Sequence, residues 1–131
     1  MGKIERIKIP TFRDERGGLS VIEFNDYVDW KPERIYYVTD VKKERGGHAV
    51  LKEKKVYICV QGSITARIHD GSSWREYNLK GPDDGIILND MCYREFKDFS
   101  KGSVLLSVSN MVYKKENYIY DFDEFLKKAN K

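Results

Sequence analysis

The stretch from His48 to Ser73 decides the fold and reads "HAVLKEKKVYICVQGSITARIHDGSS". It contains three short runs rich in β-branched and aromatic residues: HAVLK (48–52), KVYICVQ (55–61) and ITARIH (64–69). The second run ends in QGS and the third in HDGSS, where glycine supplies the positive φ of a tight turn and Asp or Ser can bond its own backbone. The stretch therefore predicts consecutive strands that reverse direction.

The same pattern continues on both sides of this stretch. Further runs of this kind occupy residues 3–9, 19–24, 34–39, 74–79, 85–89, 93–96 and 104–110. Short strands about every ten residues, separated by Gly, Pro, Asp or Ser, are typical of an all-β sandwich or barrel.

The end of the chain is the exception to the β pattern. The tail "DFDEFLKKANK" (121–131) offers Asp121 or Asp123 as an N-cap, places Phe122 and Phe125 on one face, and has lysines in its last turn. These signals predict one short C-terminal helix docked on the sheet.

Length and composition favour one globular domain spanning residues 1–131. The chain has 131 residues, of which 40% are hydrophobic, enough to build one core. Its net charge of +3 comes from 24 basic and 21 acidic residues mixed along the chain. Such mixing indicates a solvated surface rather than a nucleic-acid-binding stripe.

The amino terminus and the cysteines favour a cytoplasmic protein. "MGKIERIKIPTF" has no apolar block long enough for a signal peptide or a membrane span. Cys59 and Cys92 lack CxxC spacing and lie in apolar surroundings, as expected for reduced structural thiols.

His48 is the first candidate for proton-transfer chemistry. The other histidine, His69, lies in "IHDGSS" and is expected at a hairpin turn, whereas His48 opens an expected strand. Alternation places His48, Val50 and Lys52 on one face of that strand. From the residues alone, a ligand-site histidine and a satisfied core or rim histidine are both open.

The residues around His48 do not favour a metal. Small barrels hold metals with a histidine pair at i and i+2 followed by a glutamate, because alternate strand residues enter the same cavity. Here the i+2 position is Val50, which leaves only His48 and Glu53 as ligands. We therefore expect neither a catalytic metal nor a cofactor.

Basic and phenolic side chains at strand ends are candidates for substrate binding and proton transfer. Guanidinium groups grip phosphate oxygens bidentately, so the candidates for binding, with Lys52, are Arg16, Arg34, Arg45 and Arg94. Charged strand ends are also often only solvated. Tyr36 and Tyr37 point to opposite faces, so one is expected to line the cavity, where its hydroxyl can bind a ligand such as a sugar or move a proton, or where it serves only as a wall residue.

Taken together, these segments resemble the dTDP-sugar 3,4-ketoisomerases of the cupin superfamily. The matching pieces follow the family's order: RDERGGLSVIE (13–23), RIYYV (34–38), RGGHA (45–49), ICVQGSI (58–64), HDG (69–71), YREFKDFS (93–100), VLLSVSN (104–110) and YIYDFDEF (118–125). The resemblance implies a cupin-type jelly roll, a double-stranded β-helix barrel.

The resemblance also implies a function and an assembly. Such enzymes convert dTDP-4-keto-6-deoxyglucose into a 3-keto sugar by metal-free proton transfer through an enediol, in deoxy-amino-sugar synthesis for surface polysaccharide. Relatives form homodimers that exchange strands. The apolar amino-terminal segments "IPTF" and "LSVIEF" are available for that exchange.

One position departs from the family's motif. The family resembles "RGxHAHK", whereas this chain reads "RGGHAVL", so Val50 stands where a second histidine is expected. Either His48 works with Tyr36, Tyr37 or a carboxylate such as Glu95, or the protein is another nucleotide-sugar epimerase or isomerase, or a non-catalytic nucleotide-sugar-binding module.

Overall fold

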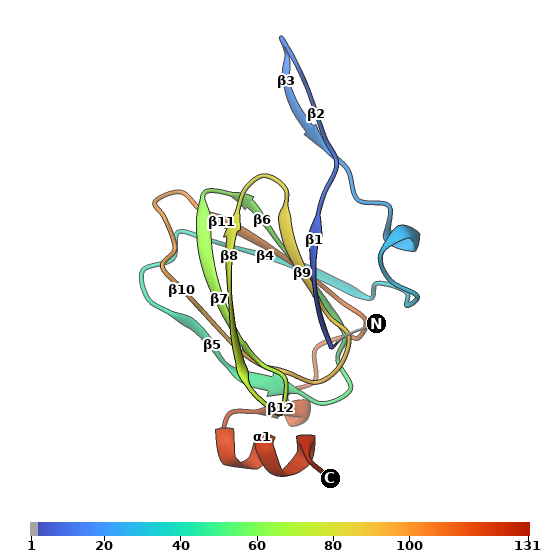
Figure 1. Ribbon diagram of the computed structural model, residues 1–131, viewed down its shortest axis with the longest axis vertical. Coiled ribbons are helices and arrows are strands. Elements are labelled where there is room, and N and C mark those ends of the chain that lie inside the picture. The colour runs from blue at the N-terminus through green and yellow to red at the C-terminus, as the bar shows by residue number, and fades with distance from the viewer. Residues whose placement is uncertain (1–2) are drawn as a thin grey trace.

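Two five-stranded antiparallel sheets pack face to face in a jelly roll (Figure 1), which the computed structural model describes for residues 3–131. The strand order of the first sheet is β1 (Ile4–Lys8), β9 (Asp84–Leu88), β6 (Lys55–Gln61), β11 (Val104–Ser109) and β4 (Arg34–Thr39). That of the second is β12 (Tyr118–Ile119), β5 (Arg45–Val50), β10 (Tyr93–Lys97), β7 (Ser63–His69) and β8 (Trp74–Lys80). The all-β fold expected from the strand spacing and the cupin-type jelly roll implied by the resemblance are therefore confirmed. Residues 1 and 2 of the expected domain lie outside the described residues.

The interior between the sheets is filled by alternate residues of the central strands. Tyr57 and Cys59 of β6 meet Ile64, Ala66 and Ile68 of β7, and all five are buried. Cys59 and Cys92 are free thiols in this interior, and burial raises their pKa values to about 11 and about 12. They are unreactive packing residues, as the sequence indicated.

Each sheet is also covered on its outer face. Residues 21–30, which include the 3-10 helix η1 (Phe24–Asp26), pack over the first sheet around Val56, Ile58 and Val108. The helix α1 (Phe122–Ala129) packs over the second sheet, where Phe125 is fully buried.

The predicted helix begins with the expected cap. The side chain of Asp121 accepts a hydrogen bond from the backbone nitrogen of Asp123 at 3.1 Å. Lys127 and Lys128 lie in the last turn, where they complement the helix dipole.

The amino-terminal prediction was wrong in its details. No strand covers 19–24 in the described chain; β2 (Thr11–Asp14) and β3 (Gly17–Ser20) form a separate hairpin, and Phe24 starts η1. The reason is the turn at "DERGG", where Asp14 accepts a hydrogen bond from the backbone nitrogen of Arg16 and Gly17 adopts a φ of 135°. This turn reverses the chain early, so Ile22 and Phe24 pack on the sheet surface instead of pairing in a strand.

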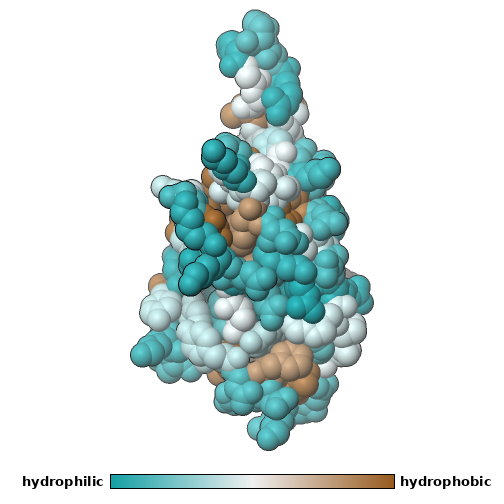
Figure 2. Space-filling model, turned by 90° about the vertical axis from the view of Figure 1, so that its left-hand side faces the viewer, coloured by the Kyte–Doolittle hydropathy of each residue, from teal (hydrophilic) through white to brown (hydrophobic). Residues whose placement is uncertain are grey.

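The hairpin projects beyond the body of the molecule (Figures 1 and 2). Phe12 and Leu19 are cross-strand partners on it and are 63% and 64% exposed. It leaves from the end of the barrel where Lys8 pairs with Asp84.

Candidate functional site

A small cavity lies between the two sheets near one end of the barrel. Its volume is about 70 Å³, and its walls come from both sheets: Tyr36, Val38, Tyr57 and Leu105 from the first, and Arg45, Gly46, His48 and Phe96 from the second. Because a typical ligand pocket holds about 300–1,000 Å³, only part of a sugar nucleotide fits inside.

The glycine pair before His48 shapes this wall. Gly46 has a φ of 95°, and an added Cβ would lie 2.7 Å from the carbonyl oxygen of Arg94. The β5–β10 pairing shifts register between Arg94 and Glu95, opposite this position. Glycine is needed here because the two backbones approach closely at the bulge. β5 consequently begins at Arg45, three residues earlier than predicted, and ends at Val50.

His48 lies on the inner face of β5 and stacks on Tyr118, with ring centroids 4.9 Å apart. Burial, and after it the positive charge of Arg94, lower its pKa to about 4. At neutral pH the imidazole is therefore uncharged and can accept a proton.

A buried charged cluster lies beside the cavity. Arg94 and Glu53 form a close ion pair, and the Glu53 carboxylate also accepts from Ser109 Oγ at 2.8 Å and from Lys55 Nζ at 3.4 Å. Arg34 Nη2 lies 3.7 Å from the same carboxylate. Three cations thus surround one carboxylate, which leaves the cluster with excess positive charge.

Tyr36 lies on the inner face of β4 and lines the cavity opposite His48. Burial alone would raise the pKa of its phenol, but the charge of Lys55 and hydrogen bonding lower the pKa overall. The cavity therefore combines an uncharged imidazole with an acidified phenol, two groups that can exchange protons with a bound ligand.

Two candidate catalytic residues point away from this cavity. Tyr37 is 70% exposed on the outer face of β4. Glu95 lies on the outer face of β10, where it accepts from Arg67 Nη1 at 2.8 Å. Strand alternation explains both placements, because Tyr36 and Arg94 occupy the inward positions beside them.

The basic candidates are scattered. Arg45 lies at the exposed rim of the cavity, and Arg34 lies partly buried near Tyr118 and Glu53. Arg94 is 2% exposed and donates to Tyr57 Oη, the Cys92 carbonyl and Glu53, so its guanidinium serves the interior of the protein and not a phosphate. Lys52 lies beyond the end of β5 in an exposed turn with a φ of 64°, at the opposite end of that strand from Arg45.

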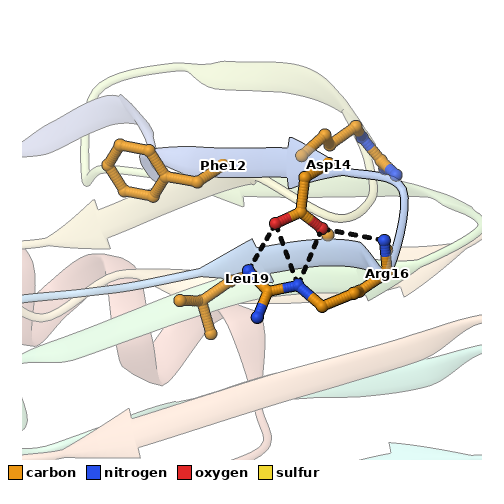
Figure 3. Close-up of a pocket in the computed structure, with 7 residues that line it drawn as sticks. Phe12, Asp14, Arg16 and Leu19 are labelled. Atoms are coloured by element: carbon orange, nitrogen blue, oxygen red, sulfur yellow. Dashed lines mark hydrogen bonds and ion pairs between the residues drawn. The ribbon is translucent and has the colours of Figure 1, made fainter.

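Arg16 lies on the projecting hairpin and not in the wall of the cavity. It faces Asp14 in an exposed ion pair near the tip of the hairpin (Figure 3). A wide groove of about 350 Å³ runs along this hairpin past Phe12 and Leu19. Within one chain, the structure therefore separates Arg16 from His48.

The sequence reasoning did not select Lys55 or Tyr57, and it considered Glu53 only as a metal ligand. A signal for Lys55 was present: it starts the run "KVYICV", and alternation places it on the same face as Tyr57 and Cys59. A lysine at an inward-facing position is rare unless it is paired.

Residues 3–131 contain neither a metal-ligand cluster nor a membrane-spanning helix. No group of three or more His, Cys, Asp or Glu side chains there is arranged to hold a metal ion. In the same part of the chain, no helix has the length and apolar character needed to cross a membrane.

The protein is a cupin-type jelly roll whose interior presents a histidine, a tyrosine and several buried cations, and comparison with known proteins identifies its family. The family described as "WxcM-like, C-terminal" (FdtA) matches residues 2–130. The chain therefore belongs to this family.

Several relatives are characterised isomerases. The TDP-4-oxo-6-deoxy-alpha-D-glucose-3,4-oxoisomerase of Aneurinibacillus thermoaerophilus is 34% identical over 116 residues, which cover 87% of this chain and 84% of that protein. The sugar 3,4-ketoisomerase QdtA of Thermoanaerobacterium thermosaccharolyticum, solved in complex with TDP, superposes with a TM-score of 0.90 at 30% identity and covers 98% of this chain and 95% of its own. The TDP-quinovose 3,4-ketoisomerase WlaRB of Campylobacter jejuni gives 0.87 at 32% identity, with coverage of 97% and 99%. These similarities make the chain an isomerase-type enzyme and disfavour a purely binding role.

Proposed function

We propose that this protein is a 3,4-ketoisomerase that acts on a TDP-linked 4-oxo-6-deoxy sugar in deoxysugar synthesis for surface polysaccharide. The observation that carries the proposal is the pairing of His48 and Tyr36 across one cavity, from opposite sheets. The relatives named above, which act on sugars of this kind, supply the substrate class.

The two groups suit the chemistry of a 4-oxo sugar. The proton on C3 is acidic because it lies next to the carbonyl. His48 takes this proton while Tyr36 gives one to the C4 oxygen, which produces an enediol. Tyr36 then takes the proton of the C3 hydroxyl, and His48 returns its proton to C4. Two protons change places, no oxidant is needed, and both groups end as they began.

Excess positive charge stabilises the intermediate. Negative charge develops on the C4 oxygen as the C3 proton leaves, in a buried site where Arg34, Lys55 and Arg94 outnumber Glu53. Preorganised charges of this kind commonly supply a large share of catalysis. Arg34 also has a buried Nε that has no hydrogen-bond partner among residues 3–131, and this donor is available to a substrate oxygen.

The nucleotide binds outside the cavity. The cavity of about 70 Å³ admits only the reacting part of the sugar, so the pyrophosphate lies across the rim near Arg45. This arrangement predicts salt-sensitive binding, because exposed arginine–phosphate contacts are screened.

The hairpin suggests a homodimer, and the thiols suggest a cytoplasmic location. A lone two-stranded hairpin is marginal in water, and this one exposes Phe12 and Leu19. We infer that it exchanges onto a second copy, which would cover both side chains and bring Arg16 to the partner. The free, buried thiols fit a reducing compartment.

Proton exchange tests the reaction directly. The protein is incubated with dTDP-4-keto-6-deoxyglucose in deuterated water and the sugar is followed by NMR. Deuterium at C3 or C4 with a 3-keto product supports the proposal. Label confined to C5, or to C3 without carbonyl movement, indicates an epimerase. Binding of dTDP without any exchange indicates a binding module.

A further inference from the structure

We propose that Lys55 is the positioning residue that keeps Tyr36 ready for proton transfer and so replaces the function of the missing second histidine. This inference rests on the proposed ketoisomerase function. Lys55 does not line the cavity, so it acts through Tyr36 and does not touch the sugar.

The location of Lys55 is unusual for a lysine. Its side chain is 1% exposed on the inner face of β6, and its Nζ lies 4.7 Å from the ring centroid of Tyr36 and 5.4 Å from that of Tyr57. Ser107 of β11 is the register partner of both Tyr36 and Tyr57, and Ser109 is the partner of Lys55. Lys55 and Tyr36 therefore sit in adjacent rows of the same sheet face.

The carboxylate of Glu53, which lies near Lys55, already has other partners. Glu53 forms its closest contact with Arg94, and it also accepts from Ser109. The contact from Lys55 Nζ to Glu53 is longer, at 3.4 Å. Removing an ammonium group from water costs several kcal/mol unless it is compensated, so Lys55 needs a second partner. The ring and hydroxyl of Tyr36 provide that partner.

The electrostatics agree with this geometry. Burial lowers the pKa of Lys55, while the charge of Lys55 lowers the pKa of Tyr36 against the effect of burial. The two groups interact directly, so their titration belongs to the pair. A phenol with a lowered pKa gives up its proton more readily than an isolated tyrosine.

Other charged groups face the same region and must be considered. They lie on four strands and the β5–β6 turn: Arg34 on β4, His48 on β5, Glu53 in the turn, Tyr57 on β6 and Arg94 on β10. The charge of Arg94 also lowers the pKa of Tyr36, but the charge of Lys55 has the larger effect. Arg34 and Arg94 cannot exchange protons at neutral pH, and burial raises the pKa of Tyr57 far above its usual value.

The test compares Lys55→Gln with Lys54→Gln. Glutamine keeps a donor for Glu53 but removes the charge, and Lys54 is the adjacent lysine, which lies just before β6 and is only partly buried. We expect Lys55→Gln to lower kcat about 10- to 100-fold, with little change in KM or in dTDP affinity. Lys54→Gln should behave as the parent.

A double variant separates positioning from simple destabilisation. If Lys55 acts through Tyr36, then Tyr36→Phe/Lys55→Gln should be no slower than Tyr36→Phe alone. Multiplied losses would overturn the proposal. Lys55→Met serves as a second uncharged variant if Lys55→Gln does not fold.

A spectroscopic titration gives a readout that does not need turnover. The phenolate absorbance of Tyr36 is obtained as the difference between the parent and Tyr36→Phe, and it should appear below the ordinary tyrosine pKa of about 10. The same difference measured in the Lys55→Gln background should move to higher pH. An ordinary titration of Tyr36 in the parent, or one unchanged by Lys55→Gln, would refute the inference. If the parent exchanges no sugar proton, the ketoisomerase assignment is wrong. The inference about Lys55 is tested separately, because the titration still decides whether Lys55 acts on Tyr36.

Discussion

At the scale of single residues, the chemistry of the site depends on burial as much as on residue type. His48 is an ordinary histidine in sequence, but burial and Arg94 hold it neutral. Tyr36 and Tyr37 are neighbours in sequence, yet only Tyr36 meets the cavity. The residue predictions therefore concern protonation states.

His48→Asn should abolish proton exchange into the sugar while dTDP affinity is retained. Asparagine preserves part of the size and hydrogen bonding of histidine but cannot accept the C3 proton. Loss of a general base typically costs about 10²–10⁴ in rate. Exchange measured by NMR together with calorimetric dTDP binding checks this, and an active His48→Asn variant would remove His48 from the mechanism.

The acid limb of kcat/KM should lie near pH 4 and not near the usual histidine value of about 6.5. Only neutral His48 can act as the base, and it stays neutral until the pH falls through about 4. Because the folded pKa is below the unfolded one, folding stability is full above pH 6.5 and decreases as the pH falls from there toward 4. Rates at low pH must therefore be paired with unfolding curves. A limb at pH 6.5 in a folded sample would contradict the assignment.

Val50→His should raise ketoisomerase activity, and the gain should be larger in the Lys55→Gln background. Val50 is 2% exposed and shares a strand face with His48, so a histidine there restores the family's pair. Burying the imidazole costs about 1–3 kcal/mol if it finds no partner, which a melting curve will register. Val50→Ala provides the control for altered packing.

At the scale of elements, the direction of each strand decides which residues cooperate. β10 carries Arg94 and Phe96 inward and Tyr93 and Glu95 outward. The bulge opposite Gly46 keeps the β5 wall open to the cavity. One residue of slippage in β10 would remove Arg94 from the charged cluster, and the same slippage in β5 would turn His48 away from the cavity.

Glu95→Gln should leave kcat within about twofold of the parent and change stability by less than about 1 kcal/mol, because its partner Arg67 is a surface group on the outer face. Steady-state kinetics and urea unfolding check both points. A Glu95→Gln variant that folds but does not turn over would return this carboxylate to the list of catalytic residues.

At the scale of the whole molecule, the projecting hairpin is the feature that one chain does not account for. Its two strands pair only with each other within the described residues. Figure 2 shows it standing clear of the body, with apolar surface below it. The second copy that we propose would account for both observations.

Phe12→Ser/Leu19→Ser should convert a dimer into a monomer at micromolar concentration. The two side chains lie opposite each other and expose apolar surface that only a partner can cover. Sedimentation velocity of the parent and the variant measures the change, and Arg13→Ser on the same hairpin is the matched control. A monomeric parent would rule out strand exchange.

The resemblance of the sequence to a known family implied the jelly roll, and the residues by themselves determined the all-β class, the capped C-terminal helix and His48 as the first candidate for proton transfer. The last three rest on local rules: strand spacing, turn residues and the period of two, each acting over a few neighbouring residues. The prediction failed at residues 19–24, where a turn at "DERGG" and packing of Phe24 outweighed strand propensity.

Only the tertiary structure decided which residues form the site. Lys55 and Tyr36 are far apart in the chain and meet because β11 pairs with both of their strands. Glu95 and Arg94 are adjacent in the chain but face opposite sides of one sheet. Burial, which sets the pKa values of His48 and Lys55, is a property of the assembled barrel and has no local signature in the sequence.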